Sequence, residues 1–151
     1  MNFEHHADRV FFASLLCEGD VALLAELYGQ LFDFRPPAVK RAEFNRLRPR
    51  LLADLIRQFG RVCMLQYPSL CQGGAILQVD HFIPLSSNVL NKMIRQLPSE
   101  TGKKVQTQSF GSNNPANLLL ACPRCNAFKK HRMPTRELMT TVNAIKTERK
   151  T

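Results

Sequence analysis

The distribution of apolar residues changes at Gly60, and this change constrains the fold more than any other feature of the chain. Before Gly60, apolar residues recur at the three- and four-residue spacing of amphipathic helices. After it, they form short runs at 62–65, 75–79 and 118–121, each flanked by turn or polar residues, which is typical of strands. The sequence therefore predicts an α+β fold with a helical N-terminal half.

Three helical stretches are predicted before Gly60. Asp20 is expected to cap the second, because its carboxylate can accept from the free amides of the next turn. The third runs over about 38–59 and is expected to break or restart at Pro49, because proline lacks the donor that a helix interior needs. We interpret the apolar stripes of these helices as core packing; the alternative is a binding surface for a protein partner.

The remaining elements suggest three regions along the chain. Another helix is expected at 124–132, directly after Pro123. We divide the chain into a helical region at 1–60, a second region at 61–134 with an insertion at about 87–114, and a C-terminal helix or tail at 135–151. The order strand, long loop, strand, helix characterises the second region.

Positive charge is concentrated in the C-terminal half. The net charge is +9, yet residues 1–80 carry nine Lys/Arg and nine Asp/Glu, whereas residues 81–151 carry twelve Lys/Arg and three acids. Such a field attracts a polyanion, so a nucleic acid is the expected partner. The alternative is a solvated basic face that serves solubility.

The chain lacks the marks of a membrane or secreted protein. No stretch approaches the roughly 20 uninterrupted apolar residues of a membrane span, and the first residues lack the basic-then-apolar layout of a secretory signal. We therefore expect a cytoplasmic protein without a membrane partner. The five cysteines form an odd number, which argues against a disulfide framework and favours metal ligation for a clustered set.

Three short segments carry groups suited to phosphodiester hydrolysis. Asp80-His81 places a carboxylate beside an imidazole, Asn117 supplies an amide, and the segment 122–130 supplies a thiolate pair, another amide at Asn126 and two lysines. Hydrolysis of a phosphodiester requires an activated water, a cation that neutralises charge on the phosphate, and groups that hold both. The three segments supply side chains suited to each of these roles.

In this order, the segments resemble the HNH endonuclease family, whose members fold a two-stranded ribbon and one helix around a divalent cation (ββα-metal). The resemblance implies that His81 is the general base and that Asp80 and Asn126 hold Mg²⁺ or Mn²⁺. It implies that Asn117 pins the loop and orients the base. The match covers roughly residues 60–132.

Many HNH nucleases carry a structural zinc held by two cysteine pairs. Cys122 and Cys125 fit the second pair, with a two-residue gap that suits tetrahedral zinc. The first pair would be Cys63 and Cys71, which depart from the pattern because seven residues separate them. The resemblance thus implies a four-cysteine zinc site; the alternative is four free, partly buried thiols.

The thirty-six positions from His81 to Asn117 exceed the compact family pattern. The insertion contains an expected short helix at 89–97 and several basic residues, so it can contact DNA or be a tolerated surface excursion. The candidate DNA-contacting residues are Lys103, Lys104, Lys129, Lys130 and Arg132. His131 is a rival for the position of Asn126, but a helix would turn it to another face, so we keep it as a phosphate contact only.

The leading hypothesis is a metal-dependent DNA endonuclease similar to the small nucleases of phage, mobile elements and bacterial defence. Its main rival is a non-catalytic zinc-ribbon DNA-binding module. A third hypothesis is a toxin or effector nuclease whose N-terminal helices bind a regulatory protein. Double-strand cutting from one centre would require a dimer or two successive nicks. No dedicated recognition element is found, which favours sequence-independent cleavage.

Overall fold

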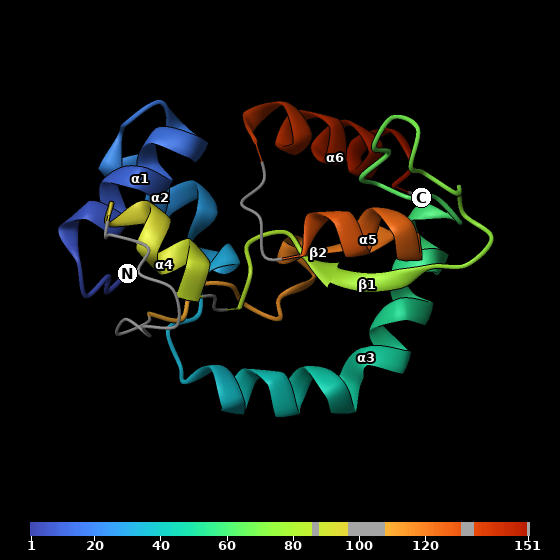
Figure 1. Cartoon of the computed structure of the whole chain (residues 1–151), viewed down its shortest axis with the longest axis horizontal. Helices are drawn as coiled ribbons and strands as arrows, with labels where there is room; N and C mark the ends of the chain where they lie inside the picture. Colours follow the sequence, from blue (N-terminus) through green and yellow to red (C-terminus); the bar gives the residue numbers. More distant parts are fainter. Residues whose placement is uncertain (86–87, 97–107, 131–134, 151) are drawn as a thin grey trace.

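The computed structural model describes residues 1–85, 88–96, 108–130 and 135–150, which form a mostly helical α+β fold (Figure 1). These ranges contain six α-helices and one two-stranded sheet: α1 His6–Cys17, α2 Val21–Tyr28, α3 Pro37–Phe59, β1 Gln78–His81, α4 Asn88–Ile94, β2 Leu118–Ala121, α5 Pro123–Lys129 and α6 Arg136–Glu148, with short 3-10 helices at Gly29–Leu31 and Pro115–Asn117. The predicted α+β class is confirmed. None of the helices in these ranges combines the length and the hydropathy needed to span a bilayer.

The helix ends before Gly60 follow local signals in the sequence. The side chain of Asp20 accepts hydrogen bonds from the amides of Ala22 and Leu23, which confirms the predicted cap of α2. Gly60 has a φ of 76° and donates from its amide to the carbonyl of Ile56, so it ends α3.

The predicted break at Pro49 is wrong, because α3 continues through this residue. Proline removes one backbone hydrogen bond, but Pro49 and Asn45, whose carbonyl loses its donor, are both exposed to water. The opposite face of the helix is held by burial of Phe44, Leu55 and Phe59. The helix changes direction along its length instead of ending (Figure 1).

Two of the three predicted strands need correction. The prediction at 118–121 is confirmed by β2, but β1 begins at Gln78, later than the predicted start at residue 75. The run 62–65 is not a strand; it is buried beside β2, and the amide of Met64 donates to the carbonyl of Leu120 at 2.8 Å. Burial alone accounts for the apolar character of that run.

The sheet lies between α3 and α5. β1 and β2 are antiparallel, with Gln78 opposite Ala121 and His81 opposite Leu118. In the view of Figure 1, α3 runs below the sheet and α5 lies above it. Side chains alternate between the two faces of a strand, so consecutive residues of β1 meet different helices.

The N-terminal helices share one core with the residues after Gly60. The ring of Phe12 packs against those of Phe32 and Phe110, and the amide of Asp33 donates to the carbonyl of Phe110. A buried ion pair of 3.2 Å joins Asp8 of α1 to Arg95, just beyond α4. The chain before Gly60 therefore packs against the region that follows and stabilises it.

Candidate functional site

Asp80 and His81 end β1 and project to opposite faces of the sheet. The His81 ring lies 4.5 Å from the ring of Phe44 on α3, measured between centroids. On the other face, Asp80 meets Lys129 of α5. The side chain of His81 therefore contacts α3, and the side chain of Asp80 contacts α5.

The tautomer of His81 follows from its hydrogen bond to Asn113. The imidazole Nε2 lies 2.8 Å from the side-chain oxygen of Asn113, whose amide nitrogen donates to the carbonyl of Lys40 at 2.9 Å. This arrangement assigns the acceptor oxygen of Asn113 to the histidine, so Nε2 carries a hydrogen. In the neutral ring, Nδ1 then keeps the lone pair that can accept a proton.

The surroundings of His81 favour the neutral ring. Burial lowers the pKa of His81, and the positive charges of Lys129 and Lys40 act in the same direction. The hydrogen bond to Asn113 and the charge of Asp80 oppose these effects without reversing them. A neutral imidazole near pH 7 is the form that a general base requires.

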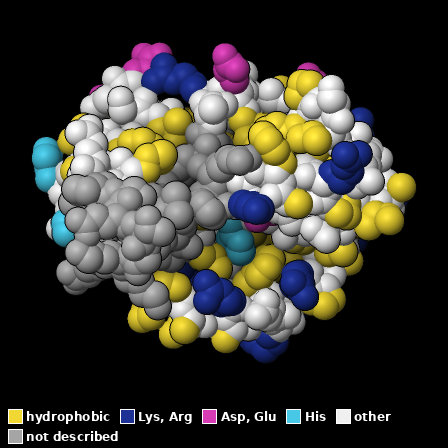
Figure 2. Space-filling model, viewed as in Figure 1, with side chains coloured by type: hydrophobic (Ala, Val, Ile, Leu, Met, Phe, Trp, Pro, Cys, Tyr) yellow, Lys and Arg dark blue, Asp and Glu magenta, His cyan; other side chains and the backbone are white. Residues whose placement is uncertain are grey.

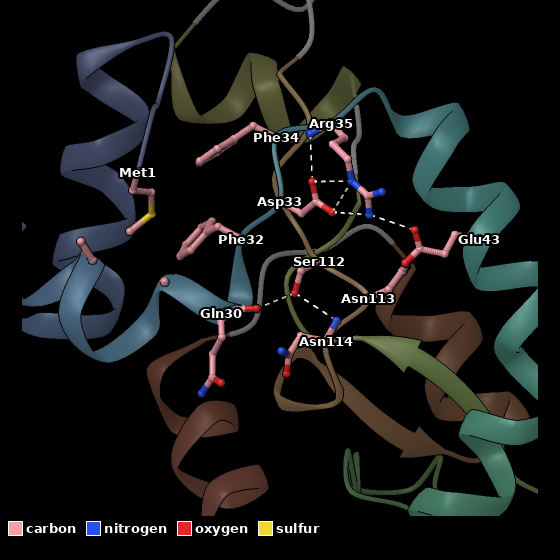
Figure 3. Close-up of a pocket in the computed structure, with 12 residues that line it drawn as sticks. Met1, Gln30, Phe32, Asp33, Phe34, Arg35, Glu43, Ser112, Asn113 and Asn114 are labelled. Carbon is pink, nitrogen blue, oxygen red and sulfur yellow. Dashed lines mark hydrogen bonds and ion pairs between the residues drawn. The ribbon is translucent and has the colours of Figure 1, made fainter.

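Asn113 also lines a cavity of about 700 Å³ (Figure 3). At its edge, the guanidinium of Arg35 contacts Asp33 at 2.8 Å and Glu43 at 2.9 Å. The carboxylate of Glu43 lies 3.5 Å from the amide nitrogen of Asn113. The network from Arg35 through Glu43 therefore helps to fix the amide that holds His81.

Lys129, expected to contact DNA, is instead buried beneath the Asp80-His81 pair. Its side chain is 1% exposed, and its ammonium donates to the carbonyl of His81 at 2.7 Å. The same ammonium lies 2.9 Å from Oδ2 of Asp80. This contact is an ion pair without hydrogen-bond geometry, and Oδ2 accepts no hydrogen bond from any residue that the structure describes.

Asn126 lies one turn before Lys129 on the same face of α5. Its amide nitrogen donates to the side-chain oxygen of Gln78 at 2.8 Å. Within the described ranges, its side-chain oxygen Oδ1 has no hydrogen-bond donor, whereas its backbone carbonyl accepts from the amide of Lys130 at 3.0 Å. Gln78 and Asp80 share one face of β1, so the oxygens of Asp80 and Asn126 are available on the same side of the sheet.

Asn117 is fully buried and fixes the backbone that follows His81. Its side-chain oxygen accepts from the amide of Ile83 at 2.8 Å, and its nitrogen donates to the carbonyls of Ile83 and Ser112 at 3.0 and 2.9 Å. Its own carbonyl accepts from the amide of Phe82 at 2.7 Å. One side chain thus joins the end of β1 to the segment that carries Asn113.

Four cysteines lie together at the start of α5. Their sulfur atoms all lie within 4.8 Å of one another, and the residues are Cys63, Cys71, Cys122 and Cys125. Sulfurs bound to one tetrahedral zinc at about 2.3 Å would be about 3.8 Å apart, close to this arrangement. The cluster can therefore hold a structural metal.

Backbone amides favour a thiolate at one position of this cluster. Burial raises the pKa of Cys63 and Cys125. Burial acts in the same direction at Cys122, but amides of Gln72 and Cys125 point at its sulfur and bring its pKa down to about 7. Cys122 also caps α5, so a metal there would fix the helix that carries Asn126.

The other predicted DNA contacts are placed only in part. Lys130 is exposed directly after α5. Lys103, Lys104, His131 and Arg132 lie outside the residues that the structure describes.

Sequence reasoning missed Asn113 and Lys40. The only sequence signal for Asn113 is its place in the polar run before Pro115, and nothing in the pattern distinguishes Lys40 from the other basic residues of α3. Comparison of the chain with models of known protein families, with curated proteins and with solved structures found no match.

Proposed function

We propose that the chain is a metal-dependent HNH endonuclease that hydrolyses DNA phosphodiester bonds. In this proposal, β1, β2 and α5 form the ββα-metal core. The observation that carries it is the buried His81, whose Nε2 is engaged by Asn113 while Nδ1 keeps its lone pair.

His81 acts as the general base. Its Nδ1 takes a proton from the water that attacks phosphorus, and the bond from phosphorus to the leaving oxygen breaks. Asn113 keeps the ring in the required tautomer, and its carbonyl-type oxygen stabilises the imidazolium that forms. Asn117 fixes the position of the strand end relative to Asn113 through three hydrogen bonds to the backbone.

Asp80 and Asn126 would hold the divalent cation, Mg²⁺ or Mn²⁺. The donor set fits, because a carboxylate and an amide oxygen are ligands suited to such an ion: Oδ2 of Asp80 accepts no hydrogen bond, although it is ion-paired with Lys129, and the side-chain oxygen Oδ1 of Asn126 has no donor among the described residues. When bound, such a cation neutralises charge that develops on the phosphate. Lys129 shares the carboxylate of Asp80 and keeps it oriented from α5.

The four cysteines would hold zinc in a structural role. Four thiolates leave no open coordination position for water, so this metal takes no part in hydrolysis. It would join the loop of Cys63 and Cys71 to the first turn of α5, which carries Asn126.

Cleavage of supercoiled plasmid tests the proposal. The wild type is incubated with Mg²⁺ or Mn²⁺, with and without a chelator, beside His81→Ala and the control His6→Ala. His6 is exposed on α1, so its replacement removes an imidazole away from the site. We expect nicked or linear DNA from the wild type and from His6→Ala with metal, and at least about a hundredfold less from His81→Ala.

The rival function, a zinc-binding DNA module without catalysis, gives a different outcome. It is favoured by the cysteine cluster, which would serve such a module equally well. DNA binding by all three proteins, with retained zinc and with no cleavage under either metal, would support the module and contradict the nuclease.

A further inference from the structure

Helix α3 is the most basic described element of the chain. It carries six Lys/Arg against two acids, although residues 1–80 as a whole are neutral. Lys40 is buried, but the arginines at 41, 46, 48 and 50 are exposed. The helix packs against His81 through Phe44, so its charge lies beside the candidate active site.

Arg41 and Arg48 lie on the side of α3 that borders this site. They stand three residues before and four residues after Phe44, so helical geometry places all three on one face. Arg48 also lines a groove of about 470 Å³, opposite Gln78 and Asn126. The groove runs between α3 and β1, and Asn126 of α5 also lines it.

The guanidinium groups of Arg41 and Arg48 form no ion pair within the described part of the chain. Neither has a carboxylate partner among the residues that the structure describes, whereas Arg50 and Arg57 both contact Asp54. Figure 2 shows Lys and Arg side chains around a central hollow in which a histidine is visible. Guanidinium groups without a carboxylate partner among the described residues are complementary to phosphates.

We infer that Arg41 and Arg48 bind phosphates of the DNA strand on either side of the phosphate that faces His81. Seven residues of helix separate them by about 10.5 Å along the axis. Phosphates that flank a third are about 7 Å apart along the duplex axis, and farther through space because the strand winds. The reach of an arginine side chain covers the difference. This assignment rests on the proposed nuclease function. It gives α3 a DNA-guiding role, because its arginines would position the DNA backbone at the site.

Arg46 provides a matched control on the same helix. It is exposed, it has no ion-pair partner within the described ranges, and helical geometry turns it about 160° away from Arg48. Alanine at any of these positions is compatible with the helix, and none of the three side chains is buried. A difference between the variants therefore reports on position rather than on charge or folding.

The experiment measures binding of a fluorescent duplex without added divalent metal, over a range of salt concentrations. We expect Arg41→Ala and Arg48→Ala each to weaken binding about 3- to 10-fold and to reduce the slope of log K against log salt by about 0.9. The double variant is expected to reduce the slope by about 2, whereas Arg46→Ala stays close to the wild type.

Equal effects at Arg41, Arg48 and Arg46 would overturn the assignment, as would a wild type that does not bind DNA. The outcome is independent of the cleavage test, because binding is measured without catalysis. A protein that shows this arginine pattern and cuts no plasmid would retain the DNA-guiding role of α3 and lose the nuclease function.

Discussion

The ammonium of Lys129 lies 2.9 Å from Oδ2 of Asp80 and donates to the carbonyl of His81 at 2.7 Å, so one buried lysine holds both residues at the end of β1. The contact joins α5 to the strand at the candidate active site. It also supplies the positive charge that a partly buried carboxylate needs when no cation is bound.

Replacement of Lys129 by Met is expected to destabilise the protein by about 2–4 kcal/mol, because Asp80 would lose its buried counter-charge and the carbonyl of His81 its donor. Cleavage should fall as well, since the strand end loses its contact with α5. Urea unfolding measures the first effect and plasmid nicking the second. Lys130→Met is the control, because this neighbour is exposed and should change stability by less than about 0.5 kcal/mol. Equal losses of stability in the two variants would contradict the role of Lys129.

Local signals in the sequence predict several elements of the fold correctly. The cap at Asp20, the helix end at Gly60 and the strand at 118–121 all follow from the type and spacing of nearby residues. The failures have a common cause. The conformation of the run 62–65 and the continuation of the helix through Pro49 depend on tertiary packing. The periodicity of apolar residues gives no information about such packing.

The same limit applies to the candidate site. The resemblance gathers four cysteines that are far apart in sequence, and the structure places them together. It gives no hint of Asn113, because the partner of His81 comes from a loop 32 residues away. Lys129 has the sequence context of a solvated lysine and is buried. Counting charge by halves of the chain hides the basic helix α3.

Removal of metal from the cysteine cluster is expected to loosen the first turn of α5. Cys71→Ser should bind less than one equivalent of zinc and should melt about 10 °C or more below the wild type, because a metal held by the four cysteines would contribute to folding. Zinc content is measured by elemental analysis and melting by circular dichroism. Cys17→Ser is the control, since Cys17 lies on α1 and not in the cluster. Full zinc content and unchanged melting in Cys71→Ser would contradict the metal site.

Lys40 is fully buried and joins three segments near the site. Its ammonium donates to the carbonyls of Asp33 and Gly111 at 2.5 Å each, and it lies 3.5 Å from the carbonyl of Leu85. Burial lowers its pKa from 10.5 to about 8; the charge of Asp33 opposes this shift, and that of Arg35 adds to it. The folded protein therefore releases this proton at a lower pH than the unfolded chain does.

This shift predicts how the contribution of Lys40 to stability depends on pH. Between about pH 8 and 10.5 the unfolded chain holds the proton that the folded protein has lost, so unfolding takes up a proton and the free energy of unfolding rises with pH. Below about pH 8 both states are protonated and the contribution is constant. Urea unfolding of the wild type and Lys40→Met should show a stability difference, wild type minus variant, that is flat up to about pH 8 and then shifts in favour of the wild type. Lys150→Met, at an exposed position, should show no such trend. A difference that stays constant or falls above pH 8 would mean that the three carbonyls keep Lys40 charged despite its burial.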